Sequence, residues 1–526
     1  MFDREELSRR DFVKGAAAAG ALMVLGRAGE ATPLAPHSDR ATLFRVVNCP
    51  VHDLEMRHRG VDALLKLLAD RGQPLYRTAL PHPWAGADGL IGHDDVVLVK
   101  VNCQWKCRGT TNTDVVRGLI HRLLQHPDGF RGEVVIIENG QGQGAFDGDP
   151  RAWNAYAPWP GIDGGVHVNA EEEGVLTIDH LVNTVFADER VSSYLLDPIR
   201  ATFLAADDHV NDGYRRVADV SYPCFTSAGG NRIELREGTW NGAAYEDRLK
   251  LINVPVLKHH DGTGVTGALK HTFGILSMWD GSAGIRHYSQ SGSQAGKMWT
   301  HVRSPILNIV DGIWVSPGSL EGYPISTTHR ANVLLAGTDP VALDYHGSKH
   351  ILLPLGGAYA SQHDPDAFPG LVDHLNGAQQ VINAAGGIDG KPTWQGDENI
   401  DVLAIEASSQ PSPAIRANGA ASDVEVPAGT PVSIEAGLVT GAAAGRAADA
   451  WLLADTPSGW WSYASGGWQR GLRRFRSGPL ADVAGLAILD EPLPPGSYTF
   501  YAAVDDNTDG VLDATWWDAV RVRVIG

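Results

Sequence analysis

Asp95-Val-Val-Leu-Val-Lys-Val-Asn102 is an almost continuous apolar run, which is typical of a strand buried on both faces of a sheet. A helix is predicted from Thr113 to His126, because apolar residues recur three or four positions apart and Thr113 and Asp114 suit a helix start. Glu133-Val-Val-Ile-Ile-Glu138 predicts the next strand. Strand, helix and strand within about 45 residues indicate a βαβ unit in a mainly parallel sheet.

Further apolar runs extend the same pattern along the chain. They predict strands at Leu249 to Val254, Asn332 to Ala336 and Asp401 to Ile405. We therefore expect an α/β domain at residues 43–405, with a mainly parallel sheet and flanking helices. Residues 150–245 are rich in Trp, Asp and Gly and only weakly periodic, so we interpret them as an insertion or cap over the sheet.

The composition changes after the α/β region. Residues 406–413 contain Ser408-Ser409-Gln410-Pro411-Ser412-Pro413, which is typical of a linker. Beyond it, runs such as Tyr498 to Val504 and Trp516 to Ile525 are strand-like, and Val and Arg alternate from Val520 to Val524 as in a half-buried strand. We expect a second domain, an all-β sandwich, at residues 414–526.

The N-terminus has the pattern of a twin-arginine export signal. Arg9 and Arg10 precede Phe12 and Lys14, a short alanine-rich apolar run follows, and Ala31 ends a small-residue cleavage site. The run is too short for a membrane anchor, which needs roughly 20 apolar residues. Residues 1–31 are therefore predicted to be the signal of a bacterial protein that the twin-arginine translocase exports, so that the mature chain is periplasmic or secreted. No later segment suggests a membrane span.

The charge excludes one class of partner. The chain of 526 residues has a formal net charge of −19 at neutral pH. Loss of the signal leaves this charge unchanged, because residues 1–31 contain five basic and five acidic side chains. Such a field repels nucleic acid, so we expect no nucleic-acid partner.

The most unusual stretch is Asn253 to Gly274, where cations gather in an acidic protein. A predicted strand leads into a Gly-rich loop, and Thr266 is predicted to cap a helix that begins at Gly267. Backbone amides at that start, together with Lys258 and Lys270, predict a site for a small anion, either a substrate or a cofactor. The catalytic candidates, which would transfer protons or hold a transition metal, are His259, His260 and His271.

A second group of polar residues follows the first predicted strand. Lys100 and Asn102 are candidates for ligand binding, because ligands of α/β sheets bind at the carboxyl ends of strands. Cys103 and Cys107 are consistent with a metal site, a disulfide or simple packing, and the neighbouring Lys106 leaves a redox role open. The chain has four cysteines, too few for a disulfide scaffold.

The main region resembles the domain-of-unknown-function 362 family over about residues 43–405. The resemblance rests on five segments, of which the second and the last carry most weight: Val97 to Asn102, Thr266-Gly-Ala-Leu-Lys-His-Thr-Phe-Gly274, Asn253 to His260, Ile309 to Gly312 and Asp339-Pro-Val-Ala-Leu-Asp344. Relatives usually have Pro at the position of Val101 and Asn at that of His271, and many carry iron–sulfur modules that this sequence lacks. The resemblance implies an α/β domain and supplies no reaction.

The aspartates of these segments fall into two roles. Asp339 precedes Pro340 and is predicted to be a helix N-cap. Asp311 and Asp344 are expected to hold Lys and His side chains or to ligate a cation, and Asp344, which would lie inside that helix, is the better site candidate.

Asp505-Asp-Asn507-Thr-Asp509-Gly510-Val-Leu-Asp513 matches the first nine positions of a calcium loop. Asp505, Asn507, Asp509 and Asp513 are the predicted metal ligands. The twelfth position is Trp516 instead of Glu, so a plain Asp/Asn/Gly turn is an equal alternative.

Two functions fit this sequence. The first is an exported enzyme whose α/β domain binds an anionic small molecule, cofactor or metal in the Lys/His-rich site. The alternative is a non-catalytic exported binding protein that uses its β-sandwich to attach to a surface, glycan or partner.

Export gives the first testable prediction. Replacing Arg9 and Arg10 with Lys should leave the precursor in the cytoplasm, because the translocase reads the arginine pair. Cell fractionation followed by immunoblotting measures this, and mature protein outside the cytoplasm would contradict the signal assignment.

Overall fold

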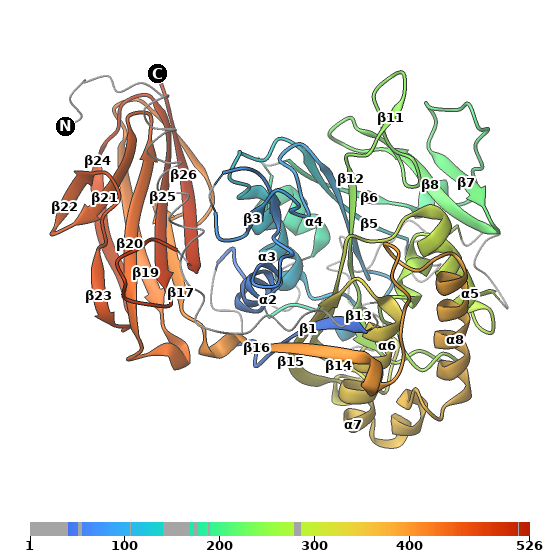
Figure 1. Ribbon diagram of the computed structural model, residues 1–526. Helices are drawn as coiled ribbons and strands as arrows, with labels where there is room; N and C mark the ends of the chain where they lie inside the picture. The colour runs from blue at the N-terminus through green and yellow to red at the C-terminus, as the bar shows by residue number, and fades with distance from the viewer. Residues whose placement is uncertain are drawn as a thin grey trace.

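The computed structural model describes residues 40–50, 55–80, 82–105, 107–139, 169–171, 177–187, 190–277, 286–513 and 515–526. Figure 1 shows an α/β domain beside a β-sandwich domain. The predicted signal and the glycine-rich residues 140–144 lie outside the described residues.

The α/β domain is built on a mixed nine-stranded sheet of order β16-β1-β15-β14-β12-β4-β5-β6, in which β13 also pairs with β14. Strand β15 runs antiparallel to β1 and β14, whereas the other pairs of the sheet are parallel. The strands are β1 (Ala41–Val47), β4 (Val96–Val101), β5 (Glu133–Glu138), β6 (Val191–Leu195), β12 (Leu249–Val254), β13 (Val256–Lys258), β14 (Leu307–Ser316), β15 (His329–Gly337) and β16 (Ile400–Glu406).

The prediction of a mainly parallel sheet therefore describes only part of the sheet, chiefly β12-β4-β5-β6. The antiparallel direction of β15 has a physical reason. Between Ser316 and His329 the chain has room for one short 3-10 turn, Ile325–Thr327, and no crossover helix, so β15 returns beside β14 as a hairpin.

The predicted βαβ unit is present as β4, α3 (Thr113–Leu124) and β5. One detail of the prediction was wrong, because the N-cap of α3 is Asn112 and not Thr113. The Asn112 side chain accepts hydrogen bonds from the backbone N–H groups of Asp114 and Val115 at 2.9 and 3.3 Å. Asn112 keeps an extended backbone, whereas Thr113 is already helical.

Side chains of the sheet alternate between two hydrophobic cores. Val97, Val99 and Val101 of β4 pack in the core that contains α2 (Arg59–Ala69) and α3, whereas Val96 and Leu98 face the opposite core. The opposite core contains α6 (Pro340–Gly347) and α8 (Pro369–Ala384), and the short helix α5 (Ser291–Lys297) packs against α8. Both faces of β4 are covered, which explains its unbroken apolar sequence.

The region predicted to be an insertion contributes to two sheets. Strand β6 joins the edge of the main sheet beside β5. The other strands form a separate antiparallel sheet of order β11-β10-β9-β8-β7, with bounds β7 (Gly213–Val217), β8 (Val220–Thr226), β9 (Arg232–Glu234), β10 (Gly238–Trp240) and β11 (Tyr245–Glu246).

The C-terminal domain consists of two sheets that enclose a third core. One sheet has the order β17-β19-β24, and the other has the order β18-β26-β25-β20-β21-β22, with β23 paired to β20. The predicted linker spans the end of β16, a 3-10 turn at Ala407–Ser409 and the start of β17. The strands are β17 (Ser412–Ala417), β18 (Val424–Pro427), β19 (Pro431–Val439), β20 (Ala447–Thr456), β21 (Gly459–Ala464), β22 (Gly467–Arg470), β23 (Arg476–Pro479), β24 (Val483–Pro492), β25 (Gly496–Asp505) and β26 (Trp516–Ile525).

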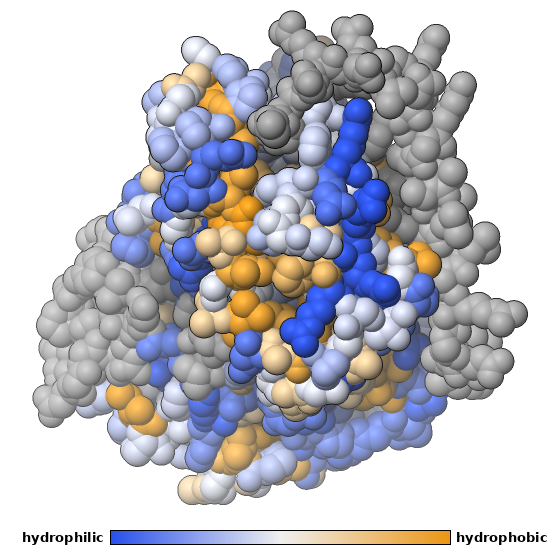
Figure 2. Space-filling model, turned by 90° about the vertical axis from the view of Figure 1, so that its left-hand side faces the viewer, coloured by the Kyte–Doolittle hydropathy of each residue, from blue (hydrophilic) through white to orange (hydrophobic). Residues whose placement is uncertain are grey.

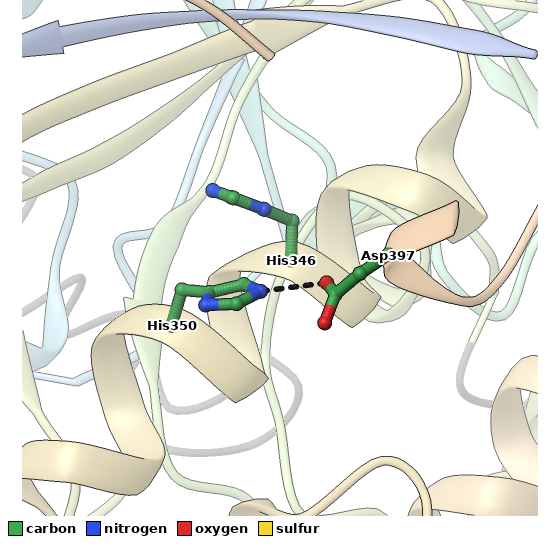
Figure 3. Close-up of side chains that lie close together, drawn as sticks. All are labelled: His346, His350 and Asp397. Atoms are coloured by element: carbon green, nitrogen blue, oxygen red, sulfur yellow. Dashed lines mark hydrogen bonds and ion pairs between the residues drawn. The ribbon is translucent and has the colours of Figure 1, made fainter. Parts of the chain in front are cut away.

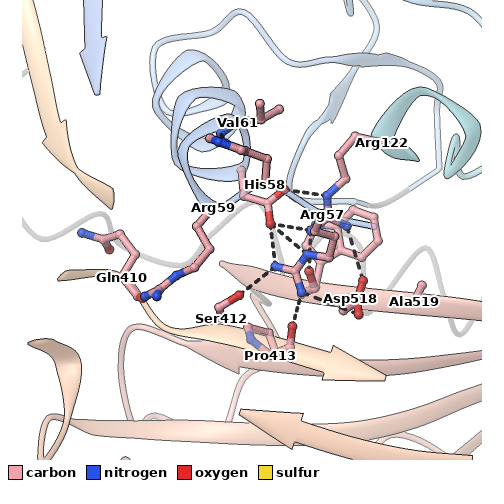
Figure 4. Close-up of polar contacts among 12 residues, drawn as sticks. Arg57, His58, Arg59, Val61, Arg122, Gln410, Ser412, Pro413, Asp518 and Ala519 are labelled. Carbon is pink, nitrogen blue, oxygen red and sulfur yellow. Dashed lines mark hydrogen bonds and ion pairs between the residues drawn. The ribbon is translucent and has the colours of Figure 1, made fainter. Parts of the chain in front are cut away.

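A buried ionic network joins the two domains (Figure 4). Asp62 of α2 binds Arg57 and also Arg122 of α3, whose Nε lies 2.7 Å from Asp62 Oδ1. Burial alone would raise the pKa of Asp62, but Arg122 and Arg57 hold it below its usual range. Arg57 also contacts the Pro413 carbonyl, and Arg122 donates to the Trp517 carbonyl at 3.0 Å. The domains are therefore held together by buried charge as well as by a shared apolar core.

The side of the β-sandwich domain that faces away from the α/β domain carries an apolar strip between charged residues (Figure 2). Large exposed apolar side chains of this domain are Leu472, Val483 and Ile525.

Candidate functional site

A buried cluster of charged side chains lies where β4, β5 and β13 end. The Lys100 ammonium contacts the Glu138 carboxylate and donates to the Val101 carbonyl at 2.7 Å. Both side chains are almost fully buried. Burial raises the pKa of Glu138 to about 8 and lowers the pKa of Lys100, and each partner opposes the shift of the other. Sequence analysis did not select Glu138, although its place at a strand end beside the Lys100 strand was a usable signal.

The segment that carries the family resemblance covers this pair. It ends in a short 3-10 helix, Lys270–Gly274, and the Gly274 carbonyl accepts from Asn139 N at 2.9 Å. A Cβ added at Gly274 would lie 2.3 Å from Lys100 Nζ and 2.6 Å from Glu138 Oε2. A side chain at this position would therefore have to displace the ends of the buried ion pair.

The backbone amides predicted to bind an external anion are bound by a side chain of the chain itself. Asp344 of α6 accepts from Ala268 N at 2.5 Å and from Leu269 N at 3.1 Å. A Cβ at Gly267 would lie 2.1 Å from Asp344 Oδ1. Thr266 does not cap a helix at Gly267, because its hydroxyl has no hydrogen-bond partner among the described residues and the 3-10 helix begins only at Lys270.

Lys258 is the buried cation of the cluster that lacks a close carboxylate. Its Nζ donates to the Gly109 carbonyl at 2.6 Å, and no ion pair is present within 4.0 Å among the described residues. Burial lowers the pKa of Lys258 to about 7, with weaker opposing effects from Glu138 and Glu321. Near neutral pH the amine is therefore present in both its charged and neutral forms.

Lys270 has hydrogen-bond and ring partners that differ from those of Lys258. Its Nζ donates to the His287 carbonyl and lies 5.0 Å from the centroid of the Phe273 ring. Burial lowers the pKa of Lys270 to about 7. Lys258 and Lys270 were predicted to bind one anion together. In the structure their ammonium groups donate to different carbonyls, those of Gly109 and His287.

The three predicted catalytic histidines have different neighbours. His259 Nε2 lies 3.0 Å from Asp261 Oδ1, and its ring packs near Tyr359 and His363. His260 Nδ1 lies 2.7 Å from the Asp261 carbonyl oxygen. His271 Nδ1 lies 2.5 Å from Asn253 Oδ1, and the pKa of His271 is lowered by burial and by Lys100. The charge of Lys258 lowers the pKa of both His260 and His271, and Lys100 lowers the pKa of His271 further.

Asn102 and Asp311 connect strand ends and loops. Asn102 Oδ1 accepts from Val256 N at 2.9 Å. Asp311 accepts from Asn112 N at 2.7 Å and Ile313 N at 3.0 Å, and burial raises the pKa of Asp311 to about 7. Asp339 is the N-cap of α6 as predicted, accepting from Val341 N and Ala342 N.

The four cysteines, Cys49, Cys103, Cys107 and Cys224, are buried. Burial raises the pKa of the Cys103 thiol well above its ordinary value, and nearby Glu138 adds to that rise. The structure therefore favours packing over thiolate chemistry at Cys103.

The predicted calcium loop joins β25 to β26. Gly510 has a positive φ of 78°, and its N–H donates to Asp449 Oδ2 at 2.9 Å. Asp509 Oδ1 accepts from Val511 N at 2.8 Å, and Asn507 Nδ2 donates to Asp513 Oδ2 at 3.0 Å. Calcium binding by this loop stays a prediction.

These observations define an exported α/β protein with a C-terminal β-sandwich domain. Residues 6–26 match the twin-arginine translocation pathway signal sequence, so the twin-arginine translocase handles the precursor and the protein is periplasmic or secreted. Residues 228–349 match the family described as Domain of unknown function (DUF362). That match includes the 266–274 and 339–344 segments, whereas the predicted resemblance began near residue 43.

Other comparisons add little. No match was found among curated proteins. A crystal structure of the CARDB domain of a Pyrococcus furiosus protein, in complex with di-metal ions, is similar at 11% identity over 22% of this chain and 93% of that chain. Its TM-score of 0.14 is too low to support an argument. Within the described residues, no helix is both long and apolar enough to cross a bilayer.

Asp344 generates a prediction on pH. Burial raises its pKa from 3.8 to about 7 in the folded protein, so its contribution to stability is present below pH 3.8 and is lost as the pH rises to about 7. Asp344→Asn imitates the neutral form, so the free energy of unfolding of the wild type should fall relative to this variant, by at most about 1.4 kcal/mol per pH unit between about pH 4 and pH 7.

Urea denaturation across this pH range measures the difference. Asp373→Asn, at an exposed position of α8, is the matched control and should follow the wild type. Parallel pH profiles for the wild type and Asp344→Asn would show that Asp344 does not gain a proton on folding.

The C-terminal loop generates a second prediction. If the loop binds calcium, a hundred-fold excess over Kd should stabilise the mature protein by about 2.7 kcal/mol, and Asp509→Ala should abolish that gain. Asp506→Ala is the control, because position two of the pattern is not a ligand position and Asp506 instead pairs with Arg446 at 3.1 Å. Thermal unfolding with and without calcium measures the gain, and equal curves for the wild type would favour the plain turn.

Proposed function

We propose that this exported protein is an enzyme that binds a small anionic molecule at the strand-end cluster, where Lys258 holds the anion and exchanges a proton with it. The observation that carries the proposal is the buried Lys258 amine, whose Nζ is hydrogen bonded to the Gly109 carbonyl and has no carboxylate within 4.0 Å among the described residues.

The position of the cluster supports this proposal. Strands β12, β4 and β5 are parallel neighbours, so Lys100, Glu138 and the segment after β12 meet at one edge of the sheet. Ligands of α/β sheets bind at that edge, outside the carboxyl ends of the strands.

The chemistry of Lys258 supports it as well. A buried ammonium without a counter-ion is costly, so an anion that brings a negative charge is favoured there. With a pKa of about 7, the same amine accepts or donates a proton near neutral pH at little cost. Lys100 is less suited to this role because Glu138 already neutralises it.

The other predicted residues have supporting roles in this proposal. His271 is the histidine that borders Lys100, so it is the second group to consider for proton transfer. Asp344 acts through the backbone, because it fixes Ala268 and Leu269 in the segment that covers the cluster. The alternative function, attachment through the β-sandwich, stays a prediction that no contact of the described residues favours.

Binding to wild type and Lys258→Met tests the proposal. Isothermal titration calorimetry with inorganic phosphate, pyrophosphate and succinate should detect binding to the mature wild-type protein. Lys258→Met should weaken that binding at least about ten-fold, because a hydrogen bond to a charged group contributes about 1.5–3 kcal/mol.

The same variant separates a ligand role from a structural one. Met keeps the apolar stem and removes a buried charge, so the free energy of unfolding should change by no more than about 1.5 kcal/mol. Lys391→Met, at an exposed lysine, is the control for loss of positive charge. Absence of binding by the wild type, or unchanged affinity in Lys258→Met, would overturn the proposal.

A further inference from the structure

A cluster of two histidines and one aspartate lies on other elements than the strand-end cluster. His346 is in the last turn of α6, and His350 is in the π-helical turn Ser348–Leu352 that continues it. Asp397 begins the 3-10 helix Asp397–Asn399 just before β16. One ligand atom from each of the three side chains lies within 4.8 Å of the others, and they are the sole such group of His, Cys, Asp or Glu in the described part of the chain.

The helix brings the two imidazoles together. Residues four apart lie on the same side of a helix, and the ring centroids of His346 and His350 are 4.5 Å apart with an interplanar angle of 36°. Figure 3 shows the two rings on neighbouring turns, with Asp397 reaching His350 from a separate segment. His350 Nε2 lies 2.7 Å from Asp397 Oδ1.

Burial differs within the cluster in a way that suits metal binding. His346 is 5% exposed, and its buried Nε2 has no hydrogen-bond partner among the described residues, so no described group competes for that nitrogen. The His350 and Asp397 side chains are 37% and 47% exposed, so an ion can enter from solvent and both side chains can rotate.

The distances allow a common ion after small rotations. Metal–ligand bonds of about 2.0–2.1 Å in tetrahedral geometry place neighbouring ligand atoms about 3.4 Å apart. The atoms here lie within 4.8 Å of one another, and His350 Nε2 and Asp397 Oδ1 are already 2.7 Å apart, so that pair must open by about 0.7 Å while any wider pair closes by about 1.4 Å or less. Rotation of the exposed His350 and Asp397 side chains supplies both changes.

Asp397 also contacts a cation through its second oxygen. Asp397 Oδ2 lies 3.0 Å from Lys349 Nζ, while Oδ1 faces His350. Lys349 is itself fixed by Asp366 and by the Tyr345 hydroxyl, each at 2.7 Å. A ligating carboxylate that is hydrogen bonded through its other oxygen is the usual outer-shell arrangement of metal sites. At this site, Oδ1 would exchange its contact with His350 for the ion.

We propose that His346, His350 and Asp397 bind one first-row divalent transition ion, such as zinc. Two imidazoles and one carboxylate are ligands of this class of ion, and three protein ligands leave a coordination position open to water or a ligand. The proposal does not rest on the function proposed for Lys258.

Cobalt(II) is the probe, because its visible absorption reports coordination by nitrogen and oxygen ligands. The mature protein is stripped with a chelator and titrated with Co²⁺ in excess calcium, which occupies the C-terminal loop if that loop binds ions. We expect one Co²⁺ per chain, a visible band, and displacement of the band by Zn²⁺.

His350→Ala and Asp397→Asn should each remove the band. Both positions are partly exposed, so the variants should unfold at temperatures close to that of the wild type, whereas His346 is buried and is left unchanged. His301→Ala, at an exposed histidine outside the cluster, is the control and should retain the band. No stoichiometric Co²⁺ binding by the wild type, or an unchanged band in His350→Ala and Asp397→Asn, would overturn the proposal.

Discussion

The contact between Lys100 and Glu138 constrains the centre of the α/β domain. It joins the ends of two neighbouring parallel strands in a place that water does not reach. A buried charge of either sign is costly alone, so each side chain depends on the other. The pair also restricts what covers it, because a side chain at position 274 would have to displace Lys100 Nζ and Glu138 Oε2. The path of the Thr266–Gly274 segment is therefore constrained by this ion pair at Gly274 and by the hydrogen bonds of Asp344 to Ala268 and Leu269.

Asp344 shows why sequence alone misidentifies an anion site. A Gly-rich loop after a strand, with free amides and nearby lysines, is the pattern of a site for a bound anion. The same pattern arises when the anion is a carboxylate from a distant part of the chain. Asp344 is 76 residues beyond Ala268, and no local feature of the loop reveals that it fills the site. The candidate centre therefore shifts from the loop amides to Lys258, whose Nζ has the Gly109 carbonyl as its one hydrogen-bond partner among the described residues.

The fold was predictable wherever burial alone determines it. Strands β5 and β12 have the predicted bounds, and β4 differs by a residue at each end, because unbroken apolar runs report burial on two faces. Strand direction was less predictable: β15 is antiparallel because of the short connection before it, and its apolar residues carry no sign of direction. The contacts between domains were not predictable, since Arg57, Asp62 and Arg122 resemble ordinary charged surface residues until Asp518 and the Pro413 carbonyl are placed beside them.

The helix α6 connects the two polar centres of the α/β domain. Asp344 on this helix binds the amides of Ala268 and Leu269, and His346, two residues later, belongs to the cluster with His350 and Asp397. Because adjacent helical positions point in different directions, one short element can serve both centres without their side chains meeting. The second centre escaped sequence analysis because its carboxylate lies 47 residues beyond His350 and the helix pattern gives no hint of that return. Any change that moves α6 therefore alters the cover of the Lys100–Glu138 pair and the spacing of the two imidazoles together.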